Sequence, residues 1–210
     1  MRKLMLVVAV MALAGVASAN LLVNPGFEVG PGGGGTPDDW WKYNETGQES
    51  WAAQTGTNGM AFWSWSNDTW GGFGQDVVQA FGSSDVLSFS IWGLAEVNFE
   101  SSIDETWILL EFWQDGNTTW TRQDRLDVYG ILTGNAGVWN QVTLITTVNL
   151  ANVTMIKPII GGGGFTNNNV GNQAVFWDNA NFYVIPEPTA VVLLGLGGLL
   201  ACMLRRNVRK

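Results

Sequence analysis

Residues 107–128 of this 210-residue chain, WILLEFWQDGNTTWTRQDRLDV, decide the fold class. They contain two segments rich in aromatic and branched side chains, which favour strands. Residues 115–117, Asp-Gly-Asn, separate the segments, and these residue types favour turns. Within the first segment, alternation places Ile108, Leu110 and Phe112 on one face of a strand. The stretch therefore predicts two strands joined by a turn, with an apolar face to bury.

Similar short segments recur along the chain and alternate with joints rich in Gly, Asn, Ser and Asp. No long segment shows helical periodicity, and regularly spaced short strands are typical of sandwiches and barrels. We therefore predict an all-β chain with a single β-sandwich of two antiparallel sheets over residues 20–185. The predicted strands cover residues 21–28, 60–66, 75–79, 86–94, 107–114, 120–128, 139–148, 153–160 and 174–184.

Missing residue types exclude several kinds of chemistry. The chain contains no His, and its one Cys is Cys202, near the C-terminus. Ser-His-Asp and Cys-His catalysis are excluded, and so are zinc sites built on His or Cys. Residues 20–185 hold no disulfide, so their stability must come from the core and a possible metal ion.

The middle of the chain is strongly acidic. All 18 Asp and Glu residues lie between Glu28 and Glu187, where the basic residues are Lys42, Arg122, Arg125 and Lys157. The formal charge of this range is near −14, against −8 for the whole chain. Because nucleic-acid binding needs clustered Lys and Arg, we expect no nucleic-acid partner.

The N-terminus has the three parts of a secretory signal peptide. Arg2 and Lys3 form a short basic region, an apolar run covers residues 4–16, and residues 17–19 are Ala-Ser-Ala. The apolar run is short for a membrane span, which needs about 20 apolar residues. We therefore predict a cleaved signal peptide over residues 1–19.

The C-terminal tail, residues 186–210, has three features in order. Pro186-Glu187-Pro188 stops the preceding strand from continuing into a helix. An apolar run over residues 189–204 predicts a transmembrane helix, and a cluster of Arg and Lys ends the chain. The positive-inside rule keeps that cluster on the cytoplasmic side of the membrane.

Together these features resemble the PEP-CTERM sorting signal, a tail also labelled an ice-binding protein C-terminal domain. The resemblance implies a Gram-negative, exopolysaccharide-producing bacterium. In that family an exosortase, a membrane protease-transpeptidase, recognises the motif that stands here as Pro186-Glu187-Pro188. The resemblance also implies that the chain is exported through the secretory pathway and anchored in the membrane before processing. The final location would be the cell surface or the extracellular matrix.

Four short motifs resemble, in order, those of jelly-roll, galactose-binding-like carbohydrate-binding modules. They are residues 24–28 (NPGFE), 58–61 (NGMA), 74–77 (GQDV) and 176–180 (FWDNA). The last motif departs from the family pattern, because Asn179 stands where a second Asp is common. The resemblance spans residues 21–184 and implies a jelly-roll sandwich.

The same resemblance implies a structural calcium ion. In the resembling modules the positions of Glu28 and Asp178 bind Ca²⁺, together with backbone carbonyls near the second motif. Carboxylate and carbonyl oxygens are the ligands that Ca²⁺ prefers. The alternative is that Glu28 and Asp178 are ordinary surface carboxylates near strand ends.

Surplus aromatic residues predict a saccharide platform. Alternation places Trp92, and also Glu111 and Trp113, on strand faces opposite to the predicted apolar faces. Trp63 and Trp65 share a face of the segment 60–66. A flat indole packs on the C–H face of a sugar ring, so these five are the carbohydrate-binding candidates. The alternative is that they pack beneath loops or form an oligomer contact.

Three functions follow from these features. The first is a non-enzymatic surface or matrix protein that binds extracellular polysaccharide. The second is a secreted glycan-active enzyme that uses two carboxylates about 5–10 Å apart. The third is a structural surface protein with no sugar ligand. We expect the first, because the chain offers many carboxylates but no motif that defines a catalytic pair.

Overall fold

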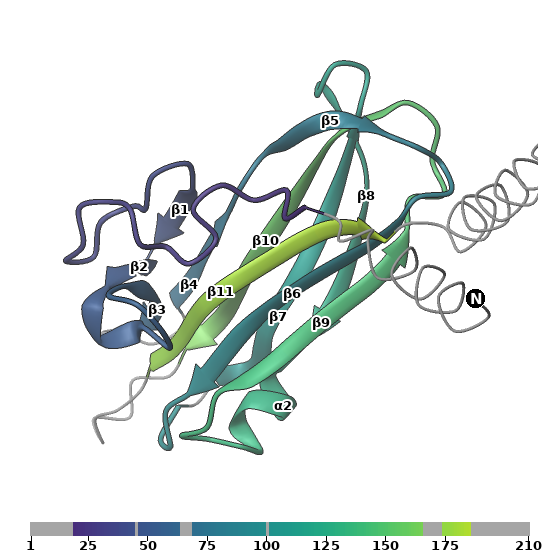
Figure 1. Ribbon diagram of the computed structural model, residues 1–210. Coiled ribbons are helices and arrows are strands. Elements are labelled where there is room, and N and C mark those ends of the chain that lie inside the picture. The colour runs from purple at the N-terminus through teal and green to yellow at the C-terminus, as the bar shows by residue number, and fades with distance from the viewer. Residues whose placement is uncertain (1–18, 45, 64–68, 100, 166–173, 186–210) are drawn as a thin grey trace, which may run out of the picture.

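The computed structural model describes residues 19–44, 46–63, 69–99, 101–165 and 174–185 of the chain, and these form two facing antiparallel sheets (Figure 1). One sheet carries a groove on its outer face and is called the groove sheet. It comprises β1 (Trp41–Asn44), β4 (Thr69–Gly74), β5 (Val77–Phe81), β7 (Ser101–Gln114), β8 (Thr119–Asp127) and β10 (Val153–Phe165). Its order is β1-β4-β10-β7-β8, and β5 pairs with one end of β10.

The opposing sheet comprises β2 (Thr46–Glu49), β3 (Gly59–Trp63), β6 (Val86–Ala95), β9 (Asn140–Thr147) and β11 (Ala174–Ile185). Its order is β2-β3-β11-β6-β9. Consecutive strands repeatedly lie in different sheets, so the chain crosses between the layers along its length (Figure 1). The predicted all-β sandwich is confirmed.

The stretch at residues 107–128 forms the expected pair of strands. β7 and β8 are antiparallel partners from Trp107 opposite Asp127 to Gln114 opposite Thr119. The turn between them has positive φ at all three residues of the Asp-Gly-Asn segment, with values of 52°, 67° and 72°. Asp, Gly and Asn tolerate this left-handed conformation better than other residues do, so the local sequence determines the turn.

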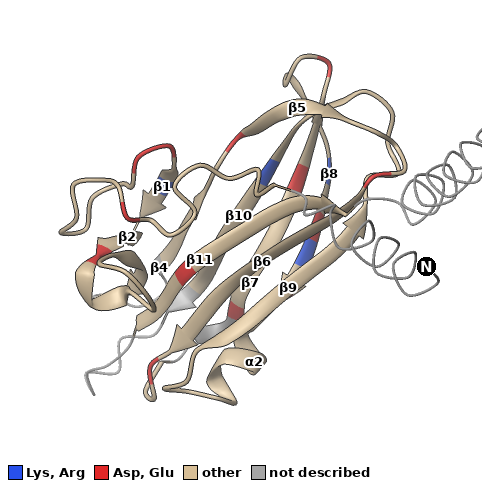
Figure 2. Ribbon diagram, viewed as in Figure 1, with Lys and Arg blue, Asp and Glu red and all other residues tan. Residues whose placement is uncertain are grey.

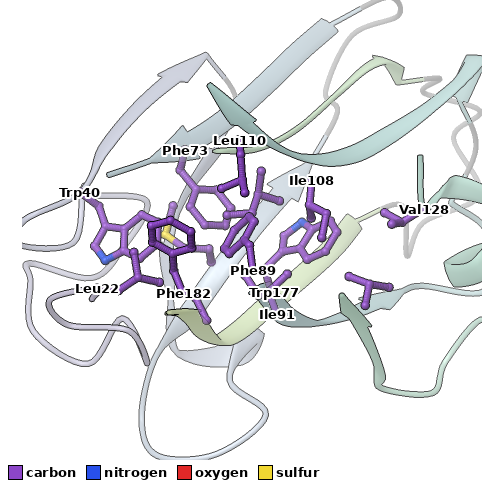
Figure 3. Close-up of a cluster of buried hydrophobic side chains, with 14 of the residues drawn as sticks. Leu22, Trp40, Phe73, Phe89, Ile91, Ile108, Leu110, Val128, Trp177 and Phe182 are labelled. Atoms are coloured by element: carbon purple, nitrogen blue, oxygen red, sulfur yellow. The ribbon is translucent and has the colours of Figure 1, made fainter. Parts of the chain in front are cut away.

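The core lies between the two sheets (Figure 3). Ile108, Leu110 and Phe112 are fully buried, as the alternation in residues 107–128 predicts. Phe89 and Ile91 of β6 meet them from the opposing sheet as part of one continuous cluster. Figure 3 shows aromatic rings filling much of this layer, with Trp40 and Phe73 toward one end and Trp177 further along.

Two short helical segments interrupt the strands. They are η1 (Ser50–Ala52) and α2 (Tyr129–Thr133). No helix in the described ranges is long and apolar enough to cross a membrane. Most of the predicted signal peptide, and the whole tail 186–210 with its transmembrane helix, lie outside the described residues.

The prediction of a strand over residues 21–28 is wrong. This segment is irregular, with positive φ at Asn24 and Phe27. Leu21 N still donates a hydrogen bond to Phe182 O at 2.7 Å, but Pro25 has no N–H to donate to a continuing ladder. The segment therefore makes isolated bonds to β11 in place of a ladder, with a second one from Ala180 N to Pro25 O at 2.9 Å, and Phe27 turns inward to be fully buried.

Glycine-rich segments that the sequence predicts as joints are strands instead. β4 includes Gly71 and Gly72, and β10 continues through residues 161–164. Both segments lie in the interior of the groove sheet, where each strand bonds to neighbours on both sides. These ladder hydrogen bonds outweigh the low intrinsic strand preference of glycine.

Candidate functional site

On the outer face of the groove sheet, aromatic rings cover glycines of the neighbouring strands. A Cβ built on Gly74 would lie 2.5 Å from Cζ2 of Trp41, and one on Gly161 would lie 2.5 Å from Cη2 of Trp107. Tyr43 covers Gly72 in the same way. Real Cβ atoms do not approach so closely, so these rings occupy space that side chains on β4 and β10 would fill.

Strand pairing explains how the rings reach the glycines. Trp41 is the Cα partner of Gly74, and Trp107 is the Cα partner of Gly161. Directly paired residues stand close together on the same face of a sheet, so a large side chain folds over a partner that has none. The rings of Trp41 and Tyr43 are nearly parallel, with centroids 6.4 Å apart and an interplanar angle of 23°.

These rings help to form a depression on this face, which we call the sheet groove. Its volume is about 320 Å³. Trp107, Leu109 and Ile159 are buried and pack together with Trp41 as an apolar cluster separate from the main core. The residues that line the groove are Trp41, Tyr43, Trp107, Leu109, Glu111, Gln123, Arg125, Lys157 and Ile159.

Polar groups complete one side of the sheet groove. Glu111 and Lys157 are Cα partners on adjacent strands. Trp113 Nε1 donates to Glu111 Oε2 at 3.3 Å, and Lys157 Nζ lies 4.6 Å from the centre of the Trp113 ring. Asp76 follows β4, accepts a hydrogen bond from Trp41 Nε1 at 3.0 Å and lies 3.5 Å from Lys157 Nζ.

Arg125 forms the opposite side. Its guanidinium lies 5.4 Å from the Trp107 ring centre and 3.4 Å from a carboxylate oxygen of Glu105. Burial, with the nearby charge of Glu111 as a smaller cause, raises the pKa of Tyr43 above its usual value. The phenol of Tyr43 therefore keeps its proton at neutral pH. The groove thus combines apolar ring faces with carboxylate, amide, guanidinium and ammonium groups.

The five predicted carbohydrate candidates do not share one surface. On the outer face of the groove sheet, Glu111 lines the groove and Trp113 lies beside it. Trp63 and Trp92 belong to β3 and β6 of the opposing sheet, and there they lie on the face away from the core. Trp65 lies outside the described residues.

Sequence reasoning missed most of the groove, including Trp41, Tyr43 and Trp107. Trp107 is in phase with Glu111 and Trp113 on β7, so alternation would have placed it on the same face. Glycines that share one strand face, at positions 72 and 74 and at positions 161 and 163, were a second signal. Glycine at every second position leaves one face of a strand bare, and a neighbouring strand can cover that face.

A second feature is formed by the predicted calcium ligands, Glu28 and Asp178, whose side chains both lie beside Gly26. We call them the carboxylate pair. A Cβ built on Gly26 would lie 3.7 Å from Cγ of Glu28 and 4.0 Å from Oδ1 of Asp178. Glu28 Oε2 accepts a hydrogen bond from Thr57 N at 2.9 Å. Asp178 Oδ2 accepts one from Gln54 N at 2.9 Å. One loop, residues 54–58, therefore holds both carboxylates.

The electrostatics of this pair fit a cation. Asp178 is fully buried, and burial is the main cause that raises its pKa; the negative charge of Glu28 raises it further. Hydrogen bonds from three backbone N–H groups act in the opposite direction. In the described part of the chain, no three or more His, Cys, Asp or Glu side chains are grouped so that they could hold a metal ion, so a Ca²⁺ ion here would also need carbonyl or water oxygens.

No protein-family model matches the chain, and no curated protein matches it. Solved structures do match it in fold. One is a family 16 carbohydrate-binding module, with 20% identity and a TM-score of 0.53 over 78% of this chain and 99% of that chain. Another comprises the CBM22-1–GH10 modules of Clostridium thermocellum endo-1,4-β-D-xylanase 10B, complexed with xylohexaose. There the identity is 13% and the TM-score 0.53, over 81% of this chain and 29% of that chain.

A third match is the enzymatically active domain of a bacteriophage tailspike protein. It has 9% identity and a TM-score of 0.55, over 79% of this chain and 21% of that chain. Identities this low show a shared fold alone and carry no information about a ligand. The chain therefore has the jelly-roll type of β-sandwich found in carbohydrate-binding modules, as the four sequence motifs predict.

Proposed function

We propose that this chain is a non-catalytic polysaccharide-binding protein whose sheet groove holds a segment of a glycan chain. The observation that carries the proposal is the aromatic surface formed by Trp41, Tyr43 and Trp107 over the glycines of β4 and β10. Sugar rings present flat C–H faces that pack on such rings. The match in fold to carbohydrate-binding modules supports the proposal.

Each part of the groove has a role in this mechanism. Trp41 and Tyr43 stack against consecutive sugar rings, and the apolar cluster with Leu109 and Ile159 excludes water. Glu111 and Gln123 hydrogen-bond the sugar hydroxyls, because a carboxylate accepts and an amide both donates and accepts. No bond in the glycan needs to break.

A glycan array and a hydrolysis assay on the same glycans test this function. The full chain would be held in a polyoxyethylene detergent, which carries no sugar. We expect binding without turnover. Turnover of a bound glycan would identify a glycan-active enzyme, and the match to the tailspike enzymatic domain makes that assay necessary. No binding and no turnover would leave a structural surface protein.

Export and sorting form a second part of the proposal. We propose that the secretory pathway of a Gram-negative bacterium exports the chain, and that an exosortase-type enzyme recognises Pro186-Glu187-Pro188 and processes the tail. The tail holds the chain in the membrane until that step, which releases it to the cell surface or matrix. Mass spectrometry of the mature protein before and after Glu187→Gln tests the step, since unchanged processing would contradict recognition of the motif.

The carboxylate pair supports a further proposal, a structural Ca²⁺ bound by Glu28 and Asp178. Chelation should lower the melting temperature of the full chain, and added Ca²⁺ should restore it. At a hundredfold excess over Kd, binding to the native state adds about 2.7 kcal/mol, or about 5–10 °C for a domain of this size. Differential scanning fluorimetry measures the shift.

Glu28→Gln is the matched variant for the calcium experiment. Its side chain is accessible and keeps an oxygen to accept from Thr57 N, so the metal-free melting temperature should change little. The Ca²⁺-dependent rise should disappear in this variant. A wild-type melting temperature that changes neither with chelator nor with Ca²⁺ would contradict the calcium site.

A further inference from the structure

We propose that the sheet groove selects an uncharged glycan and rejects chains that carry uronate or other carboxylate groups. This inference deepens the proposed function and rests on it. It follows from how the basic and acidic side chains around the groove are paired. The expected ligand is therefore a neutral polysaccharide, whose hydroxyls are its only polar groups.

Two of the four basic residues in the described ranges have structural roles away from the groove. Lys42 Nζ donates to the carbonyl oxygens of Gly34 and Thr46, both at 2.6 Å. Arg122 donates to the carbonyl oxygens of Thr147 and Val148, both at 2.8 Å. The cations at the groove are therefore Arg125 and Lys157.

The charge of each groove cation is partly neutralised by protein carboxylates. Arg125 Nη2 lies 3.4 Å from Glu105 Oε1 and 3.6 Å from Asp127 Oδ2. Lys157 Nζ lies 3.5 Å from Asp76 Oδ1, and its ammonium also faces the ring of Trp113. A ligand carboxylate that approached either cation would also approach a protein carboxylate of the same charge.

Glu111 makes the groove still less favourable to an anion. Its carboxylate lies among the lining residues beside Lys157, where its hydrogen-bond partner is the neutral indole N–H of Trp113. The lining itself contains two cations and one carboxylate, Glu111. When the carboxylates paired with those cations are counted, which are Asp76, Glu105 and Asp127, four carboxylates surround two cations. The whole range from residue 28 to 187 is also acidic, so a polyanion is repelled at long range as well. In Figure 2 acidic segments occur on both sheets and on the loops, whereas the visible basic segments lie on strands of the groove sheet.

The remaining polar groups suit hydroxyls. Glu111 offers acceptor oxygens, and Gln123 offers both a donor and an acceptor. A hydroxyl both donates and accepts, so it can bond to each of these groups, whereas a carboxylate cannot bond to Glu111.

Pairs of polysaccharides with related backbones, one uncharged and one carrying carboxylates, test the inference. The probes are xylan and glucuronoxylan, β-glucan before and after oxidation of its C6 hydroxyls to carboxylates, and methyl-esterified and de-esterified galacturonan. Affinity electrophoresis of the full chain at low salt measures each Kd. We expect at least one uncharged member to bind, and its charged partner to bind about tenfold more weakly, a difference of about 1.4 kcal/mol. Added salt should reduce the difference in Kd between the charged and uncharged members.

Asp76→Asn is the variant that reports the mechanism. It removes the carboxylate from Lys157 but keeps an oxygen to accept from Trp41 Nε1. The ratio of charged to uncharged affinity should therefore rise. Asp85→Asn is the matched control: it removes one negative charge at the turn before β6, where Asp85 Oδ2 accepts from Gly82 N, and should leave the ratio unchanged.

The outcomes separate the inference from the proposed function. Tighter binding of the charged members than of their neutral partners would overturn the inference and leave polysaccharide binding intact. An equal rise of the ratio in Asp76→Asn and Asp85→Asn would overturn the role of Lys157 pairing. No binding to any probe would overturn both the inference and the proposed function.

Discussion

Replacing Trp41 by Ala should weaken polysaccharide binding by about tenfold to a hundredfold, or about 1.4–2.8 kcal/mol, because large aromatic side chains supply much of the binding energy of such surfaces. Trp41 lies on the edge strand β1 and is partly exposed, so the sandwich core should not change. Its loss also removes the ring that stacks with Tyr43 and covers Gly74. Isothermal titration with a glycan that the array identifies measures the change in Kd.

Trp92→Ala is the control for this experiment. Sequence alternation treats Trp92 and Trp113 as equivalent, because each lies opposite an apolar strand face. In the structure Trp92 belongs to the opposing sheet and Trp113 lies beside the groove. We expect Trp92→Ala to bind normally and Trp113→Ala to bind more weakly. An unchanged Kd in Trp41→Ala, or an equal loss in Trp92→Ala, would show that the glycan does not occupy the sheet groove.

Replacing Trp177 by Ala should destabilise the protein by about 3–5 kcal/mol, because it leaves a large cavity in the core. Trp177 is fully buried and packs against Phe62, with ring centroids 5.8 Å apart. Folded domains are stable by only about 5–15 kcal/mol, so the variant should lose much of its stability. Urea unfolding followed by intrinsic fluorescence measures the free energy of unfolding.

Two further variants make the core experiment specific. Trp120→Ala removes an indole that is 50% exposed, and the free energy of unfolding should change by no more than about 0.5 kcal/mol. Trp177→Phe should cost less than Trp177→Ala, because Phe fills part of the cavity and removes an indole N–H without a partner in the described structure. Similar stabilities of Trp177→Ala and Trp120→Ala would show that Trp177 is not a core residue.

The predictable parts of the fold are those in which local sequence and tertiary environment agree. Along β7, the residues that alternate as apolar are the residues that the sandwich buries, and Ile108, Leu110 and Phe112 are all fully buried. The Asp-Gly-Asn turn forms because those residue types accept positive φ. The joint role of Glu28 and Asp178 in a calcium site was predicted from a family resemblance; the structure places both side chains beside Gly26, and calcium binding there stays a prediction.

The groove could not be predicted from single segments. β4 and the end of β10 have the glycine content of loops, and they are strands because neighbouring strands supply their hydrogen bonds. The space above Gly74 and Gly161 is filled by rings that are far away in sequence, Trp41 and Trp107. Only the register between strands places each ring over its glycine.

The sequence by itself determined the all-β class, the face of β7 that is buried, and the exclusion of His- and Cys-based chemistry, since each depends on residue types and on the period of two along a strand. The tertiary structure alone decided which aromatic side chains share a surface. Trp113 and Trp92 have the same local pattern, but the order of the strands puts them in different sheets. Alternation specifies the two faces of one strand, whereas a binding surface is made of several strands whose order and register come from long-range hydrogen bonds and core packing.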